Sequence, residues 1–470
     1  MTLFNNFSKN NNKVAIINEN SEAIKYNTLI SFIENFIINI KKRSLVFLIC
    51  NNNLETIVGY LGFIKSNCVT TLIDEKTEVG LLLNIISKYK PNYIFISNSK
   101  KLTLSGYSSE YNFFNYTLLK KNKETIIKLH DDLMMLISTS GSTGSIKFVR
   151  QSYLNLKSNT EAIVKYLKVS GNDNAITTLP ISYVYGLSVI NTHLQSGAII
   201  TLNNSSVIQK QFWKNLYVNK VTNFAGVPYT YEIIEKLDLK KFNLKYLKYT
   251  TQAGGKLPIK TVKNIISEYE QLNLKLFIMY GAAEATARMS YLSWDDVKKK
   301  PESIGKAIPG GSIWIEDEKR KKINAYNQNG EIIYKGSNVS HGYAKNISDL
   351  SKGNDNNSIL RTGDLGYKDK DKFYYLVGRK DRVIKVHGLR INLYEVEEII
   401  LNFGIRSMCL KGDNNKILIY IKVKNKTEEL KKYLSSKINL HPSSFLINSI
   451  KEFPLNKNYK ISYNKLDVKK

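Results

Sequence analysis

The sequence predicts an α/β protein: a large N-terminal domain of helix-covered β-sheets, followed by a smaller α+β unit at the C-terminus. Two observations support this prediction. Strand-like apolar runs alternate with helix-like segments through most of the chain, and the pattern changes after about residue 339. Such alternation favours parallel sheets with helices on their faces. A chain of 470 residues is also long enough to form two or more domains.

The elements of the N-terminal part follow from two kinds of pattern. Continuous apolar runs predict buried strands, and apolar residues three or four positions apart predict helices that pack on them. The expected strands are residues 45–50, 69–73, 93–96, 133–137, 199–202, 223–225 and 276–279. The expected helices are residues 54–66, 82–86 and 207–219.

The C-terminal part has shorter elements separated by polar segments. Residues 368–372 are all charged, which predicts a hairpin turn between strands at 365–367 and 373–376. Beyond Arg379 the pattern indicates a separate unit with two helices and two strands. These elements are expected at residues 394–401, 407–410, 417–421 and 427–437. We therefore expect a domain of residues 1–380 and a domain of residues 381–470.

Composition places the chain among ordinary globular proteins, with 43% hydrophobic and 23% charged residues. The N-terminus lacks a basic stretch followed by an apolar one, and no apolar run approaches the roughly 18 residues of a membrane span. We therefore expect a cytoplasmic protein without a membrane-spanning segment. Cys50, Cys68 and Cys409 are few and far apart, so we expect reduced core residues, neither a zinc site nor a disulfide framework.

The net charge of +29 has more than one interpretation. Lysine, asparagine and isoleucine are frequent throughout the chain, as an AT-rich coding sequence would produce. A docking surface for an acidic carrier protein is the second interpretation. Nucleic-acid binding is not expected, because no compact basic block is interleaved with aromatic residues and no nucleic-acid motif is present.

A Gly/Ser/Thr-rich segment follows the expected strand at residues 133–137. Its glycines allow backbone N–H groups to approach an anion closely, and its hydroxyls and lysine add further donors and a positive charge. The GxxxxGK[ST] spacing of a Walker A loop is absent, and a flexible linker is the alternative interpretation. The segment is predicted to bind phosphate through Thr139, Ser140, Gly141, Ser142, Thr143, Gly144 and Lys147.

Four further motifs follow in order along the chain. They are YGAAEAT at 280–286, RTGDLG at 361–366, GRKDRVIKVHGLR at 378–390 and PLNKNYKI at 454–461. Together with the phosphate loop, they resemble the adenylate-forming superfamily of acyl-CoA synthetases, nonribosomal peptide synthetase adenylation domains and luciferases. The resemblance extends from about residue 15 to the end, and it implies that the small C-terminal domain is mobile.

The resemblance implies an AMP-forming ligase that works in two steps. A carboxylic acid reacts with ATP to give an acyl-adenylate and pyrophosphate, and the acyl group then passes to a thiol of coenzyme A or of carrier-protein phosphopantetheine. Thr143, Glu284 and Lys460 are the expected catalytic residues. Glu284 would hold Mg²⁺, and Lys460 would bridge the carboxylate and the α-phosphate.

The resemblance also assigns residues to the nucleotide and to the second step. Tyr280 would offer a flat face to adenine, beside the close-approach glycines Gly254 and Gly255. Asp364 would accept the ribose hydroxyls, and Arg379 would add a ribose or phosphate contact. A hinge is expected at Asp381, and Gly388 would leave room for a pantetheine arm.

Three positions depart from the family pattern. Ile146 replaces a proline, Ala283 replaces a threonine and Tyr459 replaces a glycine. The first change concerns loop stiffness, the second removes one hydroxyl contact to the α-phosphate, and the third concerns the geometry of the loop before Lys460. A catalytically weakened adenylate-binding protein therefore stays open as an alternative.

The acid pocket is expected around residues 179–188, with Tyr183 and Gly186, together with Pro228 and Gly254. No aspartate occurs between residues 179 and 197 to pair with an α-amino group. Because an unpaired buried ammonium is costly, a hydrophobic or aromatic carboxylic acid is the expected substrate. A stand-alone amino-acid adenylating enzyme that serves a peptidyl carrier protein is the alternative.

Overall fold

The computed structural model divides the chain into two compact units. The first comprises Met1–Ser312 and Lys335–Leu360, and the second comprises Ile313–Tyr334 and Arg361–Lys470. The structure describes residues 11–100, 102, 104–123, 125–138, 147–387, 389–413, 416–423, 425–454 and 462–463. The predicted α/β class is confirmed.

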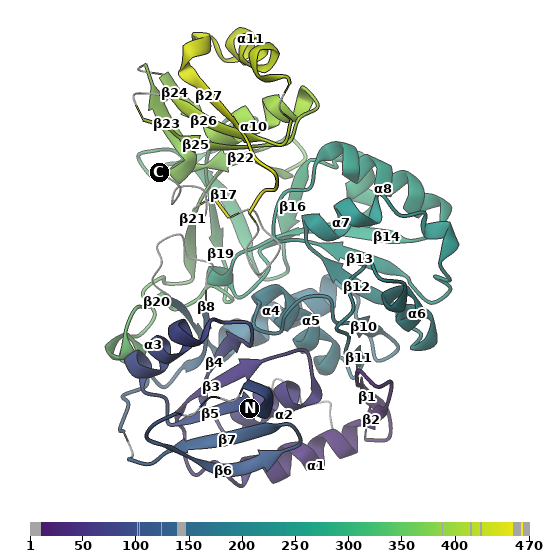
Figure 1. Ribbon diagram of the computed structural model, residues 1–470, viewed down its shortest axis with the longest axis vertical. Helices are drawn as coiled ribbons and strands as arrows, with labels where there is room; N and C mark the ends of the chain where they lie inside the picture. The colour runs from purple at the N-terminus through teal and green to yellow at the C-terminus, as the bar shows by residue number, and fades with distance from the viewer. Residues whose placement is uncertain are drawn as a thin grey trace. The chain divides into compact units, whose positions relative to one another are not determined.

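An eight-stranded sheet with a parallel centre forms one part of the first unit (Figure 1). Its strands are β3 (Leu45–Cys50), β4 (Val69–Asp74), β5 (Tyr93–Ser97), β6 (Tyr107–Phe113), β7 (Tyr116–Lys121), β8 (Leu133–Ser138), β9 (Phe148–Ser152) and β20 (Tyr343–Ala344). The order across the sheet is β20-β9-β8-β4-β3-β5-β7-β6. Strands β3, β4, β5 and β8 run parallel, whereas β6, β7, β9 and β20 pair antiparallel at the two sides.

The parallel centre of this sheet matches the sequence prediction. Every residue of β3 and β5 is buried, which explains why these strands appear as continuous apolar runs. The hairpin of β6 and β7 was not anticipated. Strand β6 has a single buried residue, Phe113, and therefore carries no apolar run.

Three helices accompany this sheet: α1 (Tyr26–Ile37), α2 (Leu54–Lys65) and α3 (Val79–Tyr89). Helix α2 begins at an Asn53 cap, whose side chain accepts a hydrogen bond from the Thr56 N–H. It contacts β3 and β4, and α1 packs on α2. Helix α3 contributes Leu82, Ile85 and Tyr89 to the buried core.

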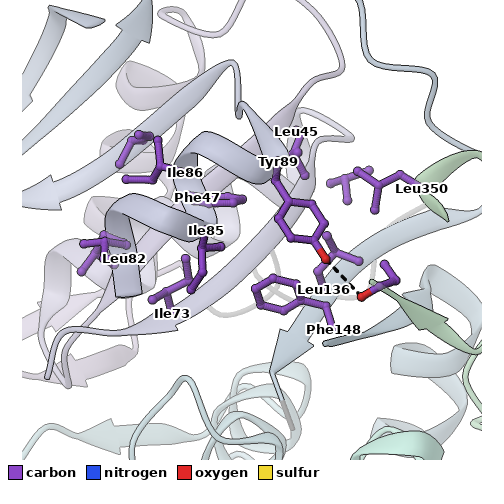
Figure 2. Close-up of a cluster of buried hydrophobic side chains, with 14 of the residues drawn as sticks. Leu45, Phe47, Ile73, Leu82, Ile85, Ile86, Tyr89, Leu136, Phe148 and Leu350 are labelled. Carbon is purple, nitrogen blue, oxygen red and sulfur yellow. Dashed lines mark hydrogen bonds between the residues drawn. The ribbon is translucent and has the colours of Figure 1, made fainter. Parts of the chain in front are cut away.

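This core fixes the position of β20 (Figure 2). Tyr89 is 1% exposed, and its ring lies 5.3 Å from the ring of Phe148 on β9. Its hydroxyl donates a hydrogen bond of 3.1 Å to the main-chain oxygen of Ala344. Because Ala344 is the second residue of β20, the contact also places the preceding residue, Tyr343.

The second part of the first unit is another sheet with a parallel centre. Its strands are β1 (Val14–Ile17), β2 (Ala23–Lys25), β10 (Asn174–Ile176), β11 (Ile199–Thr201), β12 (Asn223–Gly226), β13 (Tyr249–Gln252), β14 (Lys275–Tyr280), β15 (Ser290–Leu292) and β16 (Ser303–Ala307). Within this unit their order is β16-β15-β14-β13-β12-β10-β11-β1-β2. The pairs from β1 through β11, β10, β12 and β13 to β14 are parallel. Ligands of such sheets bind beyond the carboxyl ends of the strands, where the predicted Pro228, Gly254 and Glu284 follow β12, β13 and β14.

Helices lie on this sheet and between the two sheets. They are α4 (Tyr153–Leu167), α5 (Val184–Gln195), α6 (Lys210–Val218), α7 (Pro228–Ile234), α8 (Ile259–Gln271) and α9 (Trp294–Lys299). Helix α4 contacts β8 and β9 of the first sheet, α5 contacts β10 and β11 of the second, and the two helices pack on each other (Figure 1). The pair therefore lies between the sheets.

The second unit begins with a sheet and continues into smaller elements. The sheet strands are β18 (Lys322–Ile323), β17 (Ser312–Glu316), β19 (Gly330–Lys335), β21 (Ile359–Lys368) and β22 (Tyr374–Arg379), in that order. The later elements are β23 (Val383–Val386), β24 (Leu389–Asn392), α10 (Leu393–Asn402), β25 (Ser407–Lys411), β26 (Ile417–Ile421), α11 (Thr427–Ile438) and β27 (Phe445–Ser449). The hairpin predicted around residues 368–372 is the connection between β21 and β22.

The segment after β22 has a hydrophobic core of its own. Val396 and Ile400 of α10 pack with Cys409 and Ile419 of the small sheet and with Leu430 of α11. This core agrees with a separate folding unit near the C-terminus. The domain boundary at residue 381 stays a prediction.

The three cysteines lie in buried positions. Burial raises the pKa of the Cys68 thiol to about 11, and it raises the pKa of the Cys50 and Cys409 thiols as well. Their thiols are therefore held protonated. Among the helices of the described ranges, none is long and apolar enough to cross a membrane.

Candidate active site

The turn that carries Glu284 follows directly from the end of β14. A Cβ at Gly281 would lie 1.8 Å from the main-chain oxygen of Ala287, so only glycine allows the chain to fold back this closely. A 3-10 turn, Ala283–Ala285, follows, and Thr286 closes it with a φ of 66°. The turn presents the Glu284 side chain beyond the carboxyl end of the strand.

Buried amides hold the main chain of this turn. Gln151 Nε2 on β9 donates to the oxygen of Ala283 at 3.0 Å, and Asn338 Nδ2 donates to the oxygen of Ala285 at 2.8 Å. The Ser340 N–H donates to the oxygen of Glu284 at 2.8 Å. The position of Glu284 is therefore fixed by β9 and by the segment that leads to β20.

The Glu284 carboxylate lies beside a tyrosine and a lysine from distant parts of the chain. The Tyr343 hydroxyl donates to Glu284 Oε1 at 2.5 Å. Lys147 Nζ lies 4.1 Å from the centroid of the Tyr343 ring. Glu284 Oε2 accepts no hydrogen bond from the part of the chain that the structure describes. One carboxylate oxygen is thus held in place and the other is open to a ligand.

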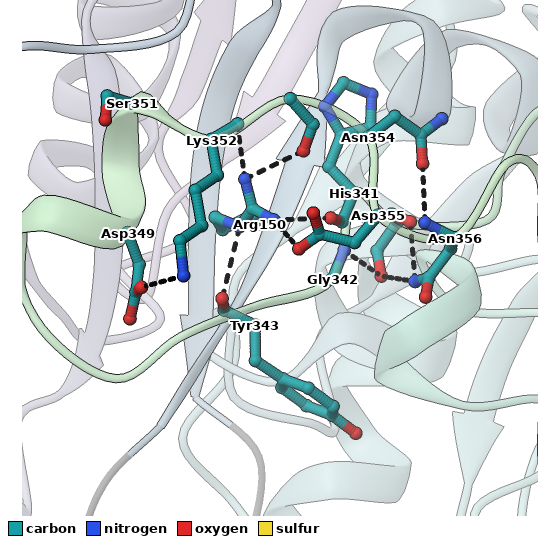
Figure 3. A network of polar contacts seen from close by, with 12 residues as sticks. Arg150, His341, Gly342, Tyr343, Asp349, Ser351, Lys352, Asn354, Asp355 and Asn356 are labelled. Carbon is teal, nitrogen blue, oxygen red and sulfur yellow. Dashed lines mark hydrogen bonds and ion pairs between the residues drawn. The ribbon is translucent and has the colours of Figure 1, made fainter.

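Arg150 positions the segment that contains Tyr343 (Figure 3). The Arg150 side chain is fully buried on β9 and donates to the main-chain oxygens of His341 at 2.6 Å and of Tyr343 at 3.2 Å. It also forms an ion pair with Asp355 and donates to the oxygen of Gly353 at 3.0 Å. Burial lowers the pKa of Arg150, and the charge of Asp355 opposes this shift. Arg150 thereby joins two stretches of main chain around β20.

Within the predicted acid segment, two stretches of main chain lie very close together. A Cβ at Gly186 would lie 2.3 Å from the oxygen of Pro180, so this position requires glycine. Tyr183 immediately precedes the first residue of α5. The Tyr185 hydroxyl donates to the oxygen of Thr251 on β13 at 2.8 Å, and burial raises its pKa. The segment is thereby tied to the strand that leads to Gly254.

The predicted glycines and proline of the first unit meet beyond the ends of β12 and β13. Gly254 has a φ of 88°, which favours glycine. Gln252 Nε2 donates to the oxygen of Gly255 at 2.9 Å and shapes the same turn. A Cβ at Gly255 would lie 3.1 Å from Pro228 Cγ, so these two residues are in contact range.

In the second unit the predicted ribose residues and the predicted hinge lie together. Asp364 on β21 is paired in register with Arg379 on β22. Arg379 Nε lies 3.3 Å from Asp364 Oδ1 and 3.4 Å from Asp381 Oδ1. The guanidinium therefore joins the carboxylate of Asp364 to the carboxylate of Asp381, the predicted hinge residue.

Several predicted residues lie outside the described residues. They are Thr139, Ser140, Gly141, Ser142, Thr143, Gly144, Ile146, Gly388, Tyr459 and Lys460. Lys147 at the end of the predicted phosphate loop is described, and its contact with Tyr343 ties this end of the loop to Glu284.

Tyr343 and Arg150 were not anticipated from the sequence. A single tyrosine among 30 has no distinguishing spacing, and its role depends on a partner 59 positions away. Arg150 bonds Tyr343 across 193 positions. The available signal was an arginine that directly follows the apolar pair Phe148 and Val149, after the predicted phosphate loop.

The residues present fit a magnesium nucleotide. Mg²⁺ prefers hard oxygen ligands and usually keeps several waters, and Glu284 offers an open carboxylate oxygen in a fixed position. Lys147 brings a positive charge to the same place. A parallel sheet with these groups beyond its carboxyl ends is typical of enzymes that bind nucleotides.

Comparison with known families identifies the class of protein. Residues 9–344 match the model of the family described as AMP-binding enzyme. This match covers more than half of the chain, so the chain belongs to the AMP-binding enzyme family.

Relatives of known function are similar over long stretches. A long-chain-fatty-acid–CoA ligase of Bacillus subtilis is 26% identical over 76% of this chain and 67% of its own length. A D-alanine–D-alanyl carrier protein ligase of Staphylococcus haemolyticus is 25% identical over 92% of this chain and 89% of its own length. For three other relatives the match to this chain spans a smaller share of their own length, namely 52%, 64% and 58%.

A solved structure confirms the fold. The O-succinylbenzoate coenzyme A synthetase of Bacillus subtilis in complex with AMP superposes with a TM-score of 0.79. The two chains are 19% identical, and the superposition covers 99% of this chain and 97% of the other. At this identity the comparison establishes the fold alone.

Proposed function

We propose that the protein is an AMP-forming ligase that activates a carboxylic acid with ATP and transfers the acyl group to a thiol. The observation that carries the proposal is the Glu284 carboxylate, fixed by Tyr343 beside Lys147. Activation brings an anionic acid to an anionic phosphate. The site must therefore neutralise and orient charge.

In the first unit the proposal gives each group a separate task. Mg²⁺, when bound, neutralises phosphate charge and orients the phosphate oxygens. Glu284 holds the ion, and Tyr343 keeps the carboxylate in one orientation. Lys147 and the hydroxyl and N–H donors of the predicted loop, Thr143 among them, bind the phosphates. Tyr280 and the turn at Gly254 receive the adenine and the acid.

In the second unit the proposal assigns residues to two tasks: binding the ribose, and changing the enzyme from the first half-reaction to the second. Asp364 accepts the ribose hydroxyls, and Arg379 orients Asp364 through their 3.3 Å contact. Arg379 also contacts Asp381, so a rotation about this hinge exchanges one of its partners. Lys460 serves adenylation, and Gly388 leaves room for the thiol arm in the second step.

The proposal covers more than one acid as the substrate and more than one thiol as the acceptor of the acyl group. One relative is named for coenzyme A and a fatty acid, and another for D-alanine and a carrier protein. The segment 179–197 has no aspartate to pair with an α-amino group. This absence favours an acid with an apolar or aromatic body over an α-amino acid. An acyl carrier protein is the acceptor to compare with coenzyme A.

Exchange of labelled pyrophosphate into ATP tests the proposal. The protein is incubated with ATP, Mg²⁺ and a panel of fatty, aromatic, dicarboxylic and amino acids. We expect exchange that depends on one class of acid and on Mg²⁺. Exchange with α-amino acids alone would establish the alternative amino-acid enzyme. ATP binding without exchange for any acid would support the adenylate-binding alternative and refute the ligase.

A further inference from the structure

Arg288 is a buried cation without a carboxylate partner. Its relative exposure is 2%, and it forms no ion pair with any residue in the described ranges. Its Nη1 donates to the Tyr166 hydroxyl at 3.0 Å, and its Nη2 donates to Ser188 Oγ at 3.2 Å. The Nε–H is buried and has no acceptor among the described residues. All its hydrogen-bond partners are thus uncharged.

Among the described residues, the other buried arginine is Arg150, and it is neutralised by an ion pair with Asp355. The half-buried Arg382 forms two hydrogen bonds with Glu397, at 2.8 and 3.0 Å. An arginine stays protonated when buried, so an unpaired one is costly for the folded state. Of the two fully buried arginines in the described residues, Arg288 is therefore the one without a counter-charge, and this needs an explanation.

The Arg288 side chain lies against the predicted acid segment. Ser188 belongs to α5, and the guanidinium carbon lies 5.0 Å from the centroid of the Tyr185 ring. Ser188 Oγ in turn donates to the main-chain oxygen of Tyr185 at 2.7 Å. Tyr185 is tied to Thr251 on β13, three residues before Gly254. The cation thus belongs to the same group of elements as the proposed acid pocket.

The main chain holds Arg288 in a fixed place relative to Glu284. The Arg288 oxygen accepts hydrogen bonds from Asn159 Nδ2 at 2.9 Å and from Asn338 Nδ2 at 3.1 Å. Asn338 also bonds the oxygen of Ala285 in the Glu284 turn. The buried cation and the proposed adenylation site are therefore positioned by one shared amide.

We propose that Arg288 binds a second acidic group of the substrate, remote from the carboxylate that reacts with ATP. This inference rests on the proposed ligase function and names its substrate class: a dicarboxylic acid with an apolar or aromatic body. A carboxylate accepts two parallel hydrogen bonds from the Nε–H and an Nη–H of a guanidinium. The Nε–H is the unpaired donor of Arg288, and the aromatic ring of Tyr185 lies beside the guanidinium, next to the predicted acid segment.

Matched pairs of acids test this inference on the unaltered protein. Hexanoate is compared with adipate, and phenylacetate with carboxyphenylacetate, by pyrophosphate exchange and by thermal shift without ATP. We expect at least one diacid to exceed its monoacid partner in kcat/KM by about 10- to 100-fold, as for a hydrogen-bonded charge pair. A panel in which monoacids or terminal amides are used equally well overturns the inference and leaves the ligase function intact.

Substitutions then connect the preference to Arg288. Arg288→Met should abolish most of the diacid preference, and Arg288→Lys should keep part of it. Arg43→Met is the matched control, because Arg43 Nη2 donates to the main-chain oxygens of His130 and Leu133, both at 2.8 Å, away from the acid segment. The Arg43→Met substitution should lower the free energy of unfolding without changing the ratio of kcat/KM between a diacid and its monoacid partner.

Failure of the inference and failure of the proposed function give different results. An unchanged diacid preference in Arg288→Met overturns the inference. If no acid supports exchange, the ligase proposal fails, and the thermal shift decides whether Arg288 binds diacids. If Arg288→Met does not fold, the acid pairs on the unaltered protein decide alone.

Discussion

Replacement of Tyr343 by phenylalanine removes one hydroxyl and leaves the ring that Lys147 contacts. The lost hydrogen bond, 2.5 Å from Tyr343 to Glu284 Oε1, involves an ionised acceptor. Such bonds contribute about 1.5 to 3 kcal/mol. Both residues are partly exposed, so we expect a value at the lower end. This corresponds to a loss of about 10- to 30-fold in kcat/KM for adenylation.

The assay is pyrophosphate exchange measured over a range of Mg²⁺ concentrations. Without the hydroxyl, Glu284 loses its fixed orientation, so more Mg²⁺ should be needed for half-maximal exchange. High Mg²⁺ should recover part of the rate. Tyr217→Phe is the control, because Tyr217 is 43% exposed on α6 and distant in sequence from the site; it should behave as the unaltered protein.

A double-mutant cycle decides whether the effect acts through Glu284. In a Glu284→Gln background the Tyr343→Phe substitution should cost far less than in the unaltered protein, because the charged acceptor is absent. Losses that simply add would refute the reasoning, since they would mean that Tyr343 acts independently of Glu284.

Four further predictions concern single residues. Arg150→Met should lower the free energy of unfolding by about 3 kcal/mol or more, measured by urea denaturation, because it removes a fully buried guanidinium that donates to the main-chain oxygens of His341, Tyr343 and Gly353. Burial lowers the pKa of His193 to about 4 from 6.5. The unfolded chain therefore takes up a proton first as pH falls, and stability should drop by about 2 kcal/mol between pH 7 and 5; His193→Gln should reduce this drop. Asp364→Ala should raise the Kd for ATP in equilibrium dialysis, with Mg²⁺ dependence unchanged. Lys460→Ala should slow acyl-adenylate formation by orders of magnitude in single-turnover assays and change thiol transfer from supplied acyl-adenylate far less.

The net charge yields one comparative test of the acceptor. Part of the net charge of +29 could form a docking face for an acidic carrier protein. In that case the rate of acyl transfer to the carrier should fall steeply as the salt concentration rises, whereas the rate of transfer to coenzyme A should fall less. Rates with both acceptors between about 50 and 300 mM salt distinguish the two, because the Debye length shortens over this range. Similar flat responses, with coenzyme A the faster acceptor, would leave the charge without a docking role.

The sequence was most informative where local pattern and tertiary environment agree. Strand β3 is buried at every position, and its apolar run predicted both its bounds. Helix α11 begins at the predicted Thr427. The helix expected from residue 207 begins only at Lys210, because Trp213 Nε1 donates to the Val207 oxygen at 2.8 Å and holds that residue in a turn. Val207 is buried without being helical, so its apolar character suggested a helix start that was wrong.

Prediction of the site was limited by contacts between distant segments. The Glu284 turn was expected from the family motif at residues 280–286, whose members are close together in the sequence. Tyr343, Arg150 and Arg288 were not, because each acquires its role from residues more than 50 positions away. Only folding brings these side chains together, and no local spacing indicates the result.

Identification of the reaction products tests the central claim most directly. The protein is incubated with ATP, Mg²⁺ and the best acid of the panel, first without a thiol and then with coenzyme A or carrier protein, and the products are determined by mass spectrometry and phosphorus NMR. The proposed function predicts an enzyme-bound acyl-adenylate and free pyrophosphate before the thiol is added, and AMP and a thioester afterwards. Formation of ADP and phosphate, or a thioester without any adenylate, would contradict it.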